Sequence, residues 1–264
     1  QFGTAFQISA SNVRFGQGAT REVGMDLVEM SAKRTLVIID PSLLDLHAGN
    51  TVLDSLRKQR VDFAVFSDVR VEPTDASFAA AIRAAGEGDF DSLVAVGGGS
   101  TIDTAKAANL YSTYPADFLD YVNAPIGKGL PIPGPLKPLI AIPTTAGTGS
   151  ETTGVAIFDQ LEQKAKTGIA HRYLKLTLGI VDAENTSSLP SAVASCAGLD
   201  VLSHALESYT ALPYDKRHQL KHPSERPAYQ GANPISDIWA LRALEIVAEY
   251  LIRAVEDTAD DVAR

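Results

Sequence analysis

Cysteine and long apolar runs are what this sequence has least of. Its 264 residues contain one cysteine, Cys196, so no disulfide can form within the chain and a reducing compartment is expected. No apolar run approaches the roughly 18 residues of a membrane-spanning helix, so no membrane partner is predicted. The first residues show neither a signal-peptide core nor an arginine-rich presequence. We therefore expect a cytoplasmic protein, with the mitochondrial matrix as the alternative if a presequence has been removed.

Basic residues are scarce relative to acidic ones. Lysine and arginine number 23 against 32 aspartate and glutamate residues, which gives a formal net charge of −9. Because nucleic-acid phosphates need a basic surface, this balance argues against nucleic acid as a partner. Small acidic substrates stay compatible with it, since they need only a local basic pocket. Hydrophobic residues make up 45% of the chain, enough for a sizeable core.

The first two-thirds of the chain alternates short apolar runs with amphipathic stretches. The runs predict strands buried on both faces of a sheet, at 35–40, 92–97, 138–143 and 178–182, with 62–67 as a less regular fifth. Helices are predicted at 49–60 and 75–87, the second with Asp75 as its N-cap. Strands separated by such helices form right-handed βαβ units. We therefore predict an α/β domain with a doubly wound, mostly parallel sheet over residues 1–188.

The pattern changes after residue 188. Residues 191–212 and 234–256 predict two long helices, each with a proline near its first turn. The stretch 213–233 between them is rich in proline and is expected to be an exposed loop. Residues 189–264 therefore predict the start of an all-α domain.

Three successive glycines, Gly97, Gly98 and Gly99, join a predicted strand to a helix expected to begin near Ile102. Glycines let backbone N–H groups turn toward a ligand, and the amino end of a helix attracts anions. The hydroxyl of Ser100 can add a further donor. The turn predicts a diphosphate site, although on spacing alone a plain strand-to-helix turn is an equally good interpretation.

A second polar loop, 142–151, also follows an apolar run. It contains Thr144, Thr145 and Thr148 together with a serine and two glycines. Hydroxyls at this density suit ribose and phosphate oxygens, although an ordinary Ser/Thr-rich turn is the alternative for one such loop taken alone. Ligands bind at the carboxyl ends of the strands in open α/β sheets, so two such loops on one edge predict a nucleotide site.

Two aspartates flank these loops. Asp40 ends the predicted strand 35–40, where a carboxylate can bind a ribose diol and disfavour a 2′-phosphate, which indicates NAD rather than NADP. The alternative is an aspartate that initiates a turn before Pro41. Asp103 and Lys106 lie three residues apart, and this spacing alone predicts a surface ion pair worth roughly a few tenths of a kcal/mol.

Asp200 and His204 lie four residues apart on the first long helix. This spacing directs both side chains to one face, where they can converge on an ion, and the donor pair suits Zn²⁺ or Fe²⁺. The alternative is a simple hydrogen bond, since two ligands do not make a site. Cys196 on the same face is predicted to be a small buried residue, and Glu207 either supports a ligand or is a solvated charge.

The remaining histidines are not expected to be functional. His218 and His222 are also four apart, but the surrounding prolines and lysines make a regular helix there unexpected. His47 and His171 are isolated in the sequence.

Taken together and in order, these segments resemble the iron-containing alcohol dehydrogenase family. The resemblance is carried by 97–106, 143–151 and 198–207. It implies an α/β domain, a helical domain, and a cleft holding NAD(P) and a divalent metal, with Asp200 and His204 as the first two metal ligands. The expected cofactor-binding residues are Asp40, Gly97, Gly98, Gly99, Ser100, Asp103, Thr144, Thr145, Thr148 and Lys166.

Further segments resemble the hydroxyacid–oxoacid transhydrogenase branch of that family. They are 69–74, 117–121, 124–129, 226–231 and 233–239. The resemblance implies that hydride passes from 4-hydroxybutyrate to 2-oxoglutarate, with the nicotinamide as carrier, and we expect a homodimer. No general base is evident; Lys128 and Arg70 are candidates to face the substrate carboxylate.

Three other functions stay open at this point. They are a simple NAD-dependent alcohol or 4-hydroxybutyrate dehydrogenase, a metal lyase of the dehydroquinate synthase type, and a non-catalytic nucleotide-binding fragment. The family's other metal ligands are histidines well downstream of His204, and 259–264 has the character of mid-domain sequence. We therefore expect the chain to be part of a longer protein, and the fragment alone to be inactive.

Overall fold

The computed structural model describes residues 3, 5–8, 10–222, 226–227, 229–257, 260 and 262–263. The stretches 213–233 and 259–264, for which the sequence analysis made predictions, include residues that lie outside the described ones, among them Pro223 and Ala228. The chain divides into two compact units. The first comprises Ser11–Thr144 and Gly149–Ser188, and the second comprises Gln1–Ala10, Thr145–Thr148 and Leu189–Arg264.

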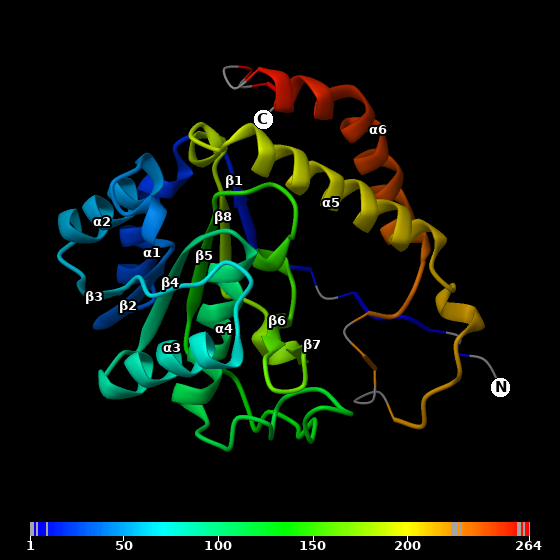
Figure 1. The fold of residues 1–264 in the computed structure, drawn as a ribbon, viewed down its shortest axis with the longest axis horizontal. Helices are drawn as coiled ribbons and strands as arrows, with labels where there is room; N and C mark the ends of the chain where they lie inside the picture. Colours follow the sequence, from blue (N-terminus) through cyan, green and yellow to red (C-terminus); the bar gives the residue numbers. More distant parts are fainter. Residues whose placement is uncertain are drawn as a thin grey trace. The chain divides into compact units, whose positions relative to one another are not determined.

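A six-stranded sheet forms the centre of the first unit, with the strand order β1-β8-β5-β4-β2-β3 and parallel pairing throughout (Figure 1). The strands are β1 (Val13–Phe15), β2 (Arg34–Ile39), β3 (Asp62–Phe66), β4 (Ser92–Gly97), β5 (Leu139–Pro143) and β8 (Leu178–Val181). The five predicted strands are therefore confirmed. The edge strand β1 was not predicted, because its three residues form no apolar run and Phe15 is exposed.

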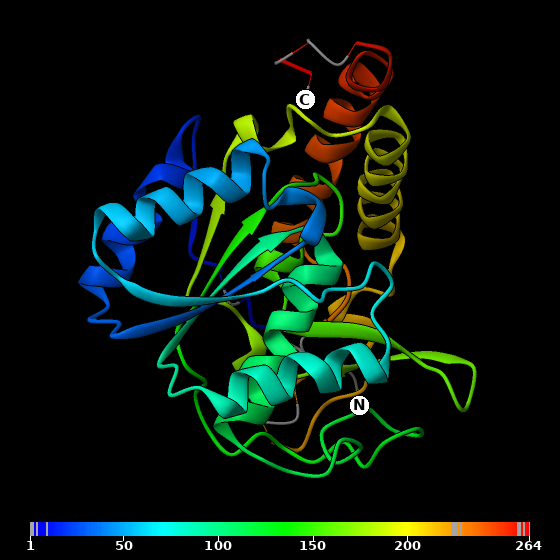
Figure 2. The ribbon, with the colours of Figure 1, turned by 60° about the vertical axis from the view of Figure 1, so that its left-hand side comes forward.

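Helices cover both faces of this sheet, as Figure 2 shows. Val37 and Ile39 of β2 pack with α1 (Val23–Glu29) and α2 (His47–Lys58). Leu36 and Ile38 point the other way and pack with two further helices, α3 (Asp75–Glu87) and α4 (Gly99–Thr113). Successive strand residues face opposite sides, and burying each such side chain contributes about 1.5–3 kcal/mol. The doubly wound α/β fold is confirmed, while α1 was not predicted.

The predicted N-cap of one helix and the predicted start of another were wrong. Thr74, and not Asp75, is the N-cap of α3: its side chain accepts a bond from the Ser77 N–H (3.2 Å), and the Ser77 hydroxyl accepts one from the Thr74 N–H (2.8 Å). This capping box satisfies two N–H groups at once and leaves Asp75 in the first turn, where its charge suits the helix dipole. The helix α4 begins at Gly99 instead of near Ile102, so the glycine turn is continuous with it.

An antiparallel hairpin of β6 (Val155–Gln160) and β7 (Ala165–Ala170) completes the first unit. It was not predicted, because residues 155–158 are all apolar and hide the alternation of a strand. In the structure Ala156 and Phe158 are fully buried and pack with Phe78 of α3 and Leu110 of α4. The hairpin therefore covers a side of α4 that the sequence left open.

The second unit is built on α5 (Ser191–Thr210) and α6 (Pro234–Glu256), which confirms the two predicted long helices. Gly198 allows them to approach closely, because a Cβ there would lie 2.2 Å from Cδ1 of Leu251. Asn233 caps α6 through the N–H groups of Ile235 (3.1 Å) and Ser236 (3.0 Å). No helix in the described part of the chain is long and apolar enough to cross a membrane.

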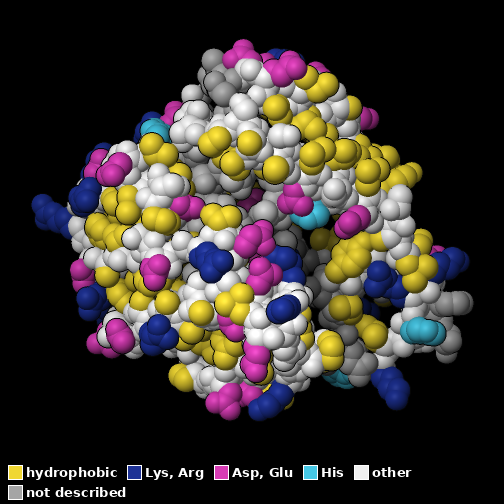
Figure 3. Space-filling model, viewed as in Figure 1, with side chains coloured by type: hydrophobic (Ala, Val, Ile, Leu, Met, Phe, Trp, Pro, Cys, Tyr) yellow, Lys and Arg dark blue, Asp and Glu magenta, His cyan; other side chains and the backbone are white. Residues whose placement is uncertain are grey.

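Apolar side chains gather along α5, where Figure 3 shows them in yellow. Leu199 and Leu206 of α5 are exposed, as are Ile238, Trp239 and Ile252 of α6. Two helices alone leave such faces uncovered, because a helix buries its apolar stripe only against another layer.

Asp182, directly after β8, ties this strand to the segment that follows β1. Its buried carboxylate accepts bonds from the backbone N–H groups of Gly18 (2.9 Å), Thr20 (3.0 Å) and Glu184 (3.1 Å). Burial by itself raises the pKa of Asp182, but these hydrogen bonds to the charged form outweigh it, so the pKa lies below its ordinary value.

We expect Asp182→Asn to lower the free energy of unfolding by about 1–3 kcal/mol at neutral pH, since buried N–H groups lose a charged acceptor. The folded-state pKa is depressed, so this stabilisation is present above the unfolded pKa of roughly 3.9 and is lost as the pH falls through the folded pKa. Urea unfolding at several pH values checks both points, with the exposed Asp54→Asn as the control. A stability difference from wild type that does not shrink on acidification would contradict this.

Candidate nucleotide site and metal ligands

The carboxyl ends of β2 and β4 form the switch point of the sheet. From β2 the chain runs through α2 to β3 on one side, and through α3 it returns to β4 on the other side of β2. Open α/β sheets bind ligands in the crevice at such a reversal. Asp40 follows β2 and Gly97 ends β4, and the N–H of Asp40 donates to the carbonyl of Val96 (3.1 Å). The two predicted features therefore meet at the switch point.

The glycine turn has the geometry of an anion cradle. Gly97 has a φ of +155°, and a Cβ there would lie 2.4 Å from Oγ1 of Thr101. Gly98 is the N-cap of α4 and Gly99 its first residue, so the helix begins without a capping side chain over its N–H groups. Among the described residues, the buried Oγ1 of Thr101 has no hydrogen-bond partner. Free N–H donors at the start of a 15-residue helix fit a diphosphate.

The side chain of Asp40 forms hydrogen bonds within its own turn. Its Oδ1 accepts bonds from the N–H (2.9 Å) and the hydroxyl (2.6 Å) of Ser42, so it caps the short helix η2 (Pro41–Leu43). The turn-initiating alternative is thus present. A contact of this carboxylate with a ribose stays a prediction.

The second loop starts beside the glycine turn. Thr144 is buried, and its N–H donates to the carbonyl of Gly97 (3.2 Å). Thr145 and Thr148 belong to the segment Thr145–Thr148, which groups with the second unit. There Gly147 lies against α5, since a Cβ on it would be 2.8 Å from the carbonyl oxygen of Ala197. The structure therefore brings Thr144 to the glycine turn, whereas Thr145–Thr148 group with α5 and Gly149 onward returns to the first unit.

The expected surface ion pair of Asp103 and Lys106 was wrong, because Lys106 is fully buried. Its Nζ donates to Asp103 Oδ1 (3.3 Å), Ser150 Oγ (2.8 Å), Thr153 Oγ1 (3.1 Å) and the Val155 carbonyl (2.7 Å). The β6–β7 hairpin covers this side of α4, which helical spacing alone cannot reveal. Burial lowers the pKa of Lys106, against the opposing effect of the Asp103 carboxylate.

Asp103 uses both carboxylate oxygens within the protein. Oδ1 accepts from the hydroxyl of Ser150 and from Lys106, and Oδ2 accepts from the N–H of Ile157 (2.9 Å). The residue therefore lies behind the glycine turn and holds α4 to β6.

Lys166, on β7, is exposed and forms ion pairs with Glu72 and with Asp159 (3.2 Å). Glu72 has a φ of +56°, which is uncommon for a residue other than glycine, and its N–H donates to Oγ of Ser100 (3.3 Å). The segment before α3 therefore lies against the glycine turn. This contact was not predictable from the sequence, because a glutamate in the left-handed conformation has no signature in composition or spacing.

Asp200 and His204 face each other on α5, with 3.6 Å between Oδ1 and Nε2. A carboxylate and an imidazole at this separation fit two positions of a Zn²⁺ or Fe²⁺ site. The described residues contain no group of three or more His, Cys, Asp or Glu side chains able to hold a metal. Cys196 is exposed, so its predicted burial was wrong: among the residues that the structure describes, no layer covers this side of α5.

The other histidines take structural roles or lie outside the regular helices. Nε2 of His47 pairs with Glu184 (3.1 Å), and Nδ1 of His171 accepts the N–H of Tyr173 (3.2 Å). His218 and His222 follow the short helix η6 (Tyr214–Lys216) and lie on no regular helix, as expected.

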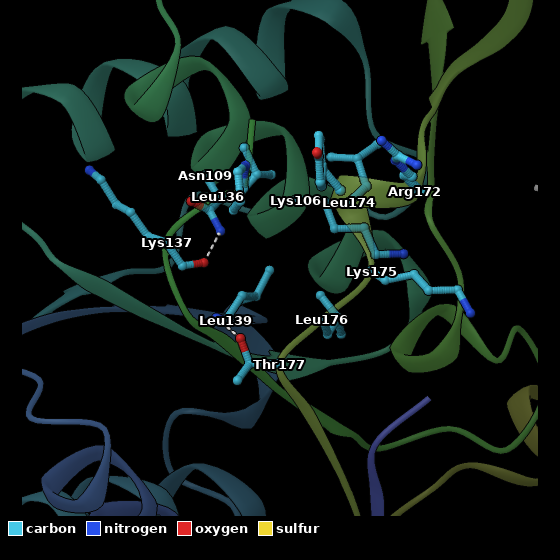
Figure 4. Close-up of a pocket in the computed structure, with 12 residues that line it drawn as sticks. Lys106, Asn109, Leu136, Lys137, Leu139, Arg172, Leu174, Lys175, Leu176 and Thr177 are labelled. Carbon is cyan, nitrogen blue, oxygen red and sulfur yellow. Dashed lines mark hydrogen bonds between the residues drawn. The ribbon is translucent and has the colours of Figure 1, made fainter. Parts of the chain in front are cut away.

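A cavity of about 260 Å³ lies at the opposite edge of the sheet, at the amino ends of β5 and β8 (Figure 4). Asn109 and Lys137 line it, with the Asn109 amide donating to the Lys137 carbonyl (2.8 Å). The side chains of Lys137 and Lys175 run to opposite sides of the view and do not converge. The predicted cofactor residues are not among those lining this cavity, so it is distinct from the nucleotide site.

Residues 10–183 match the profile of the iron-containing alcohol dehydrogenase family, and the chain belongs to that family. A solved structure of a 1,3-propanediol oxidoreductase superimposes with a TM-score of 0.85 at 26% identity, covering 98% of this chain and 62% of that one. The sulfoacetaldehyde reductase of Bifidobacterium kashiwanohense, solved in complex with NAD+, gives a TM-score of 0.84 at 27% identity, with coverage of 99% and 63%.

Within this family the chain is similar to the mitochondrial hydroxyacid-oxoacid transhydrogenases. It is 59% identical to the Mus musculus protein and 57% identical to the Homo sapiens protein, in each case over 98% of this chain and 56% of the relative. The chain thus spans little more than half the length of these curated relatives. Their names give mitochondria as the location, so the comparisons do not support the cytoplasmic location expected first.

We expect Gly97→Ala to lower the free energy of unfolding by about 1–3 kcal/mol, because a Cβ at φ +155° is strained and meets Thr101. The matched control is Gly86→Ala in α3, where nothing lies within 4 Å of the added Cβ. This change should stabilise the protein by roughly 0.5–1 kcal/mol through helix propensity. Thermal unfolding of both variants is the measurement, and equal effects of the two substitutions would refute the strained-turn interpretation.

Proposed function

We propose that this chain binds NAD at the carboxyl edge of its parallel sheet and supplies the first two ligands of a divalent metal. The observation that carries the proposal is the glycine turn at the switch point, where strand order and an uncapped helix start coincide. Membership of the iron-containing alcohol dehydrogenase family supports a hydride-transferring oxidoreductase.

The proposed nucleotide contacts follow the edge of the sheet. Gly97, Gly98, Gly99 and Ser100 would hold the diphosphate through N–H groups and a hydroxyl. Asp40 would accept bonds from the adenine ribose, which disfavours the 2′-phosphate of NADP. The other proposed contacts are Thr144, Thr145, Thr148 and Lys166. Asp103, whose oxygens are occupied within the protein, would support the turn from behind.

Asp200 and His204 would hold a divalent metal, Fe²⁺ or Zn²⁺, as the family name and the donor pair indicate. When bound, the metal would supply Lewis acidity toward a substrate hydroxyl. We propose that its remaining ligands lie in the length of the relatives that this chain does not span. The exposed apolar faces of α5 and α6 support this, because further helices would cover them. On this view 1–188 is the dinucleotide-binding domain and 189–264 begins the metal-binding domain.

The relatives' names support a substrate pair of a hydroxy acid and an oxo acid. We infer that hydride passes from a 4-hydroxybutyrate-type acid to the nicotinamide and from it to a 2-oxoglutarate-type acid. The donor carbinol is oxidised, the acceptor carbonyl is reduced, and the nicotinamide returns to its starting state. The names of the same relatives support a mitochondrial location. We also propose that the protein is a homodimer.

We expect the chain to bind NAD more tightly than NADP, and Asp40→Asn to narrow that preference by roughly tenfold, since removing the carboxylate relieves its repulsion of the 2′-phosphate. Isothermal titration with both nucleotides measures it. The control is Asp45→Asn, an exposed aspartate five residues further along the chain. An unchanged ratio of the two dissociation constants in the Asp40 variant would rule out the ribose contact.

This chain spans about half the length of its curated relatives. For a protein of the relatives' full length, we expect 4-hydroxybutyrate and 2-oxoglutarate to yield 2-hydroxyglutarate without accumulation of NADH. Mass spectrometry of the products, with absorbance of the nicotinamide, checks this. His204→Ala should reduce turnover by at least about a hundredfold while NAD binding is retained. NADH that accumulates from 4-hydroxybutyrate alone would instead indicate a simple dehydrogenase.

A further inference from the structure

We propose that Lys106 is a positioning residue for the nucleotide: it fixes the second polar loop relative to the glycine turn without touching the cofactor itself. This inference rests on the proposed NAD site. It concerns a buried cation that is neither one of the proposed nucleotide contacts nor one of the proposed metal ligands, Asp200 and His204.

Lys106 joins two segments that are distant in the chain. It lies on α4, seven residues after Gly99, so it is about 10 Å along the helix from the glycine turn. Its Nζ contacts Ser150, Thr153 and Val155, all on the stretch of chain that returns from the second loop. One ammonium group therefore connects the helix that starts at the proposed diphosphate site to the end of the loop that follows Thr144.

The chemistry of this connection favours a single arrangement. The Lys106 side chain is fully buried, and four oxygens surround its Nζ within 3.3 Å. A buried charge is tolerated only when it is paired and hydrogen-bonded, so a shift of the loop would leave the ammonium short of acceptors. Asp103 adds to this, because it accepts bonds from both Lys106 and Ser150. The network thus resists sliding of the loop along α4.

A packing role alone would be served by an apolar side chain. Replacing a buried ion pair by apolar groups of similar size is often neutral or stabilising, so the network is poorly explained by stability. Its position explains it better, since it spans the two loops at which the nucleotide is proposed to bind.

A matched control exists in the same unit. Oγ1 of Thr35 and Oγ of Ser92 form a fully buried hydrogen bond (2.8 Å) between β2 and β4. This pair lies at the amino ends of those strands, opposite to the nucleotide edge. Thr35→Val therefore removes a buried polar contact without touching the loop.

The test compares Lys106→Met, Ser150→Ala and Thr35→Val with wild type. We expect Lys106→Met to raise the NAD dissociation constant by at least about tenfold and Ser150→Ala by roughly threefold, while Thr35→Val leaves it within about twofold. Without NAD, amide hydrogen exchange of 144–153 should accelerate in the first two variants and not in the third. Unfolding curves of each variant establish that it is folded, and if Lys106→Met does not fold, Ser150→Ala decides.

Two failures are distinguishable. If wild type binds no NAD, the proposed function falls, and the hydrogen-exchange comparison still decides whether Lys106 fixes the loop. If wild type binds NAD and folded Lys106→Met or, in its place, Ser150→Ala binds it equally well with unchanged exchange, the positioning role is overturned. Thr35→Val weakening NAD binding as much as Lys106→Met would overturn it too.

Discussion

The parallel pairing of β2 with β4 is the constraint on which the rest of this structure depends. Its register opposes Val37 with Val94 and Ile39 with Val96, and so brings the residues after both strands to the same edge. Because β3 lies on the other side of β2, the connections diverge there, as at the reversals where open α/β sheets bind ligands. Asp40 and the glycine turn owe their proximity to this pairing, since Val96 lies 56 positions after Asp40 in the chain.

A second constraint acts behind that edge. The glycine turn can present its N–H groups only if α4 stays fixed, and α4 is held on one side by the sheet and on the other by the buried contacts of Lys106. Glu72, in a left-handed conformation, adds a contact to Ser100 from the segment before α3. Local strain of this kind persists where surrounding structure over-determines it, which is typical of binding sites.

Features that depend on interactions between residues close in the sequence were predictable, and features that depend on contacts between distant segments were not. Apolar runs and the prolines near helix starts are local, so the central strands and both long helices were predictable from them. The burial of Lys106 was not, because it follows from the β6–β7 hairpin packing on α4, and four residues of that hairpin are uniformly apolar. The exposure of Cys196 depends likewise on which layer covers α5. The sequence of one helix does not indicate which other elements pack on it. The turn at Gly97–Gly99 was predictable from its three glycines, whereas its place at the switch point follows from the strand order of the sheet.

The proposed chemistry sets a demand that a rigid nucleotide site would meet. In a transfer from hydroxy acid to oxo acid, the nicotinamide accepts hydride from one substrate and gives it to the next, so it has to remain bound while the substrates exchange. A simple dehydrogenase has the opposite need, because it releases the reduced cofactor in each turnover. An arrangement in which one buried ammonium fixes the loop against the glycine turn lowers the conformational cost of holding the nucleotide, and thereby favours slow release. The rate of nucleotide release, more than any single contact to it, is therefore where the two activities differ physically.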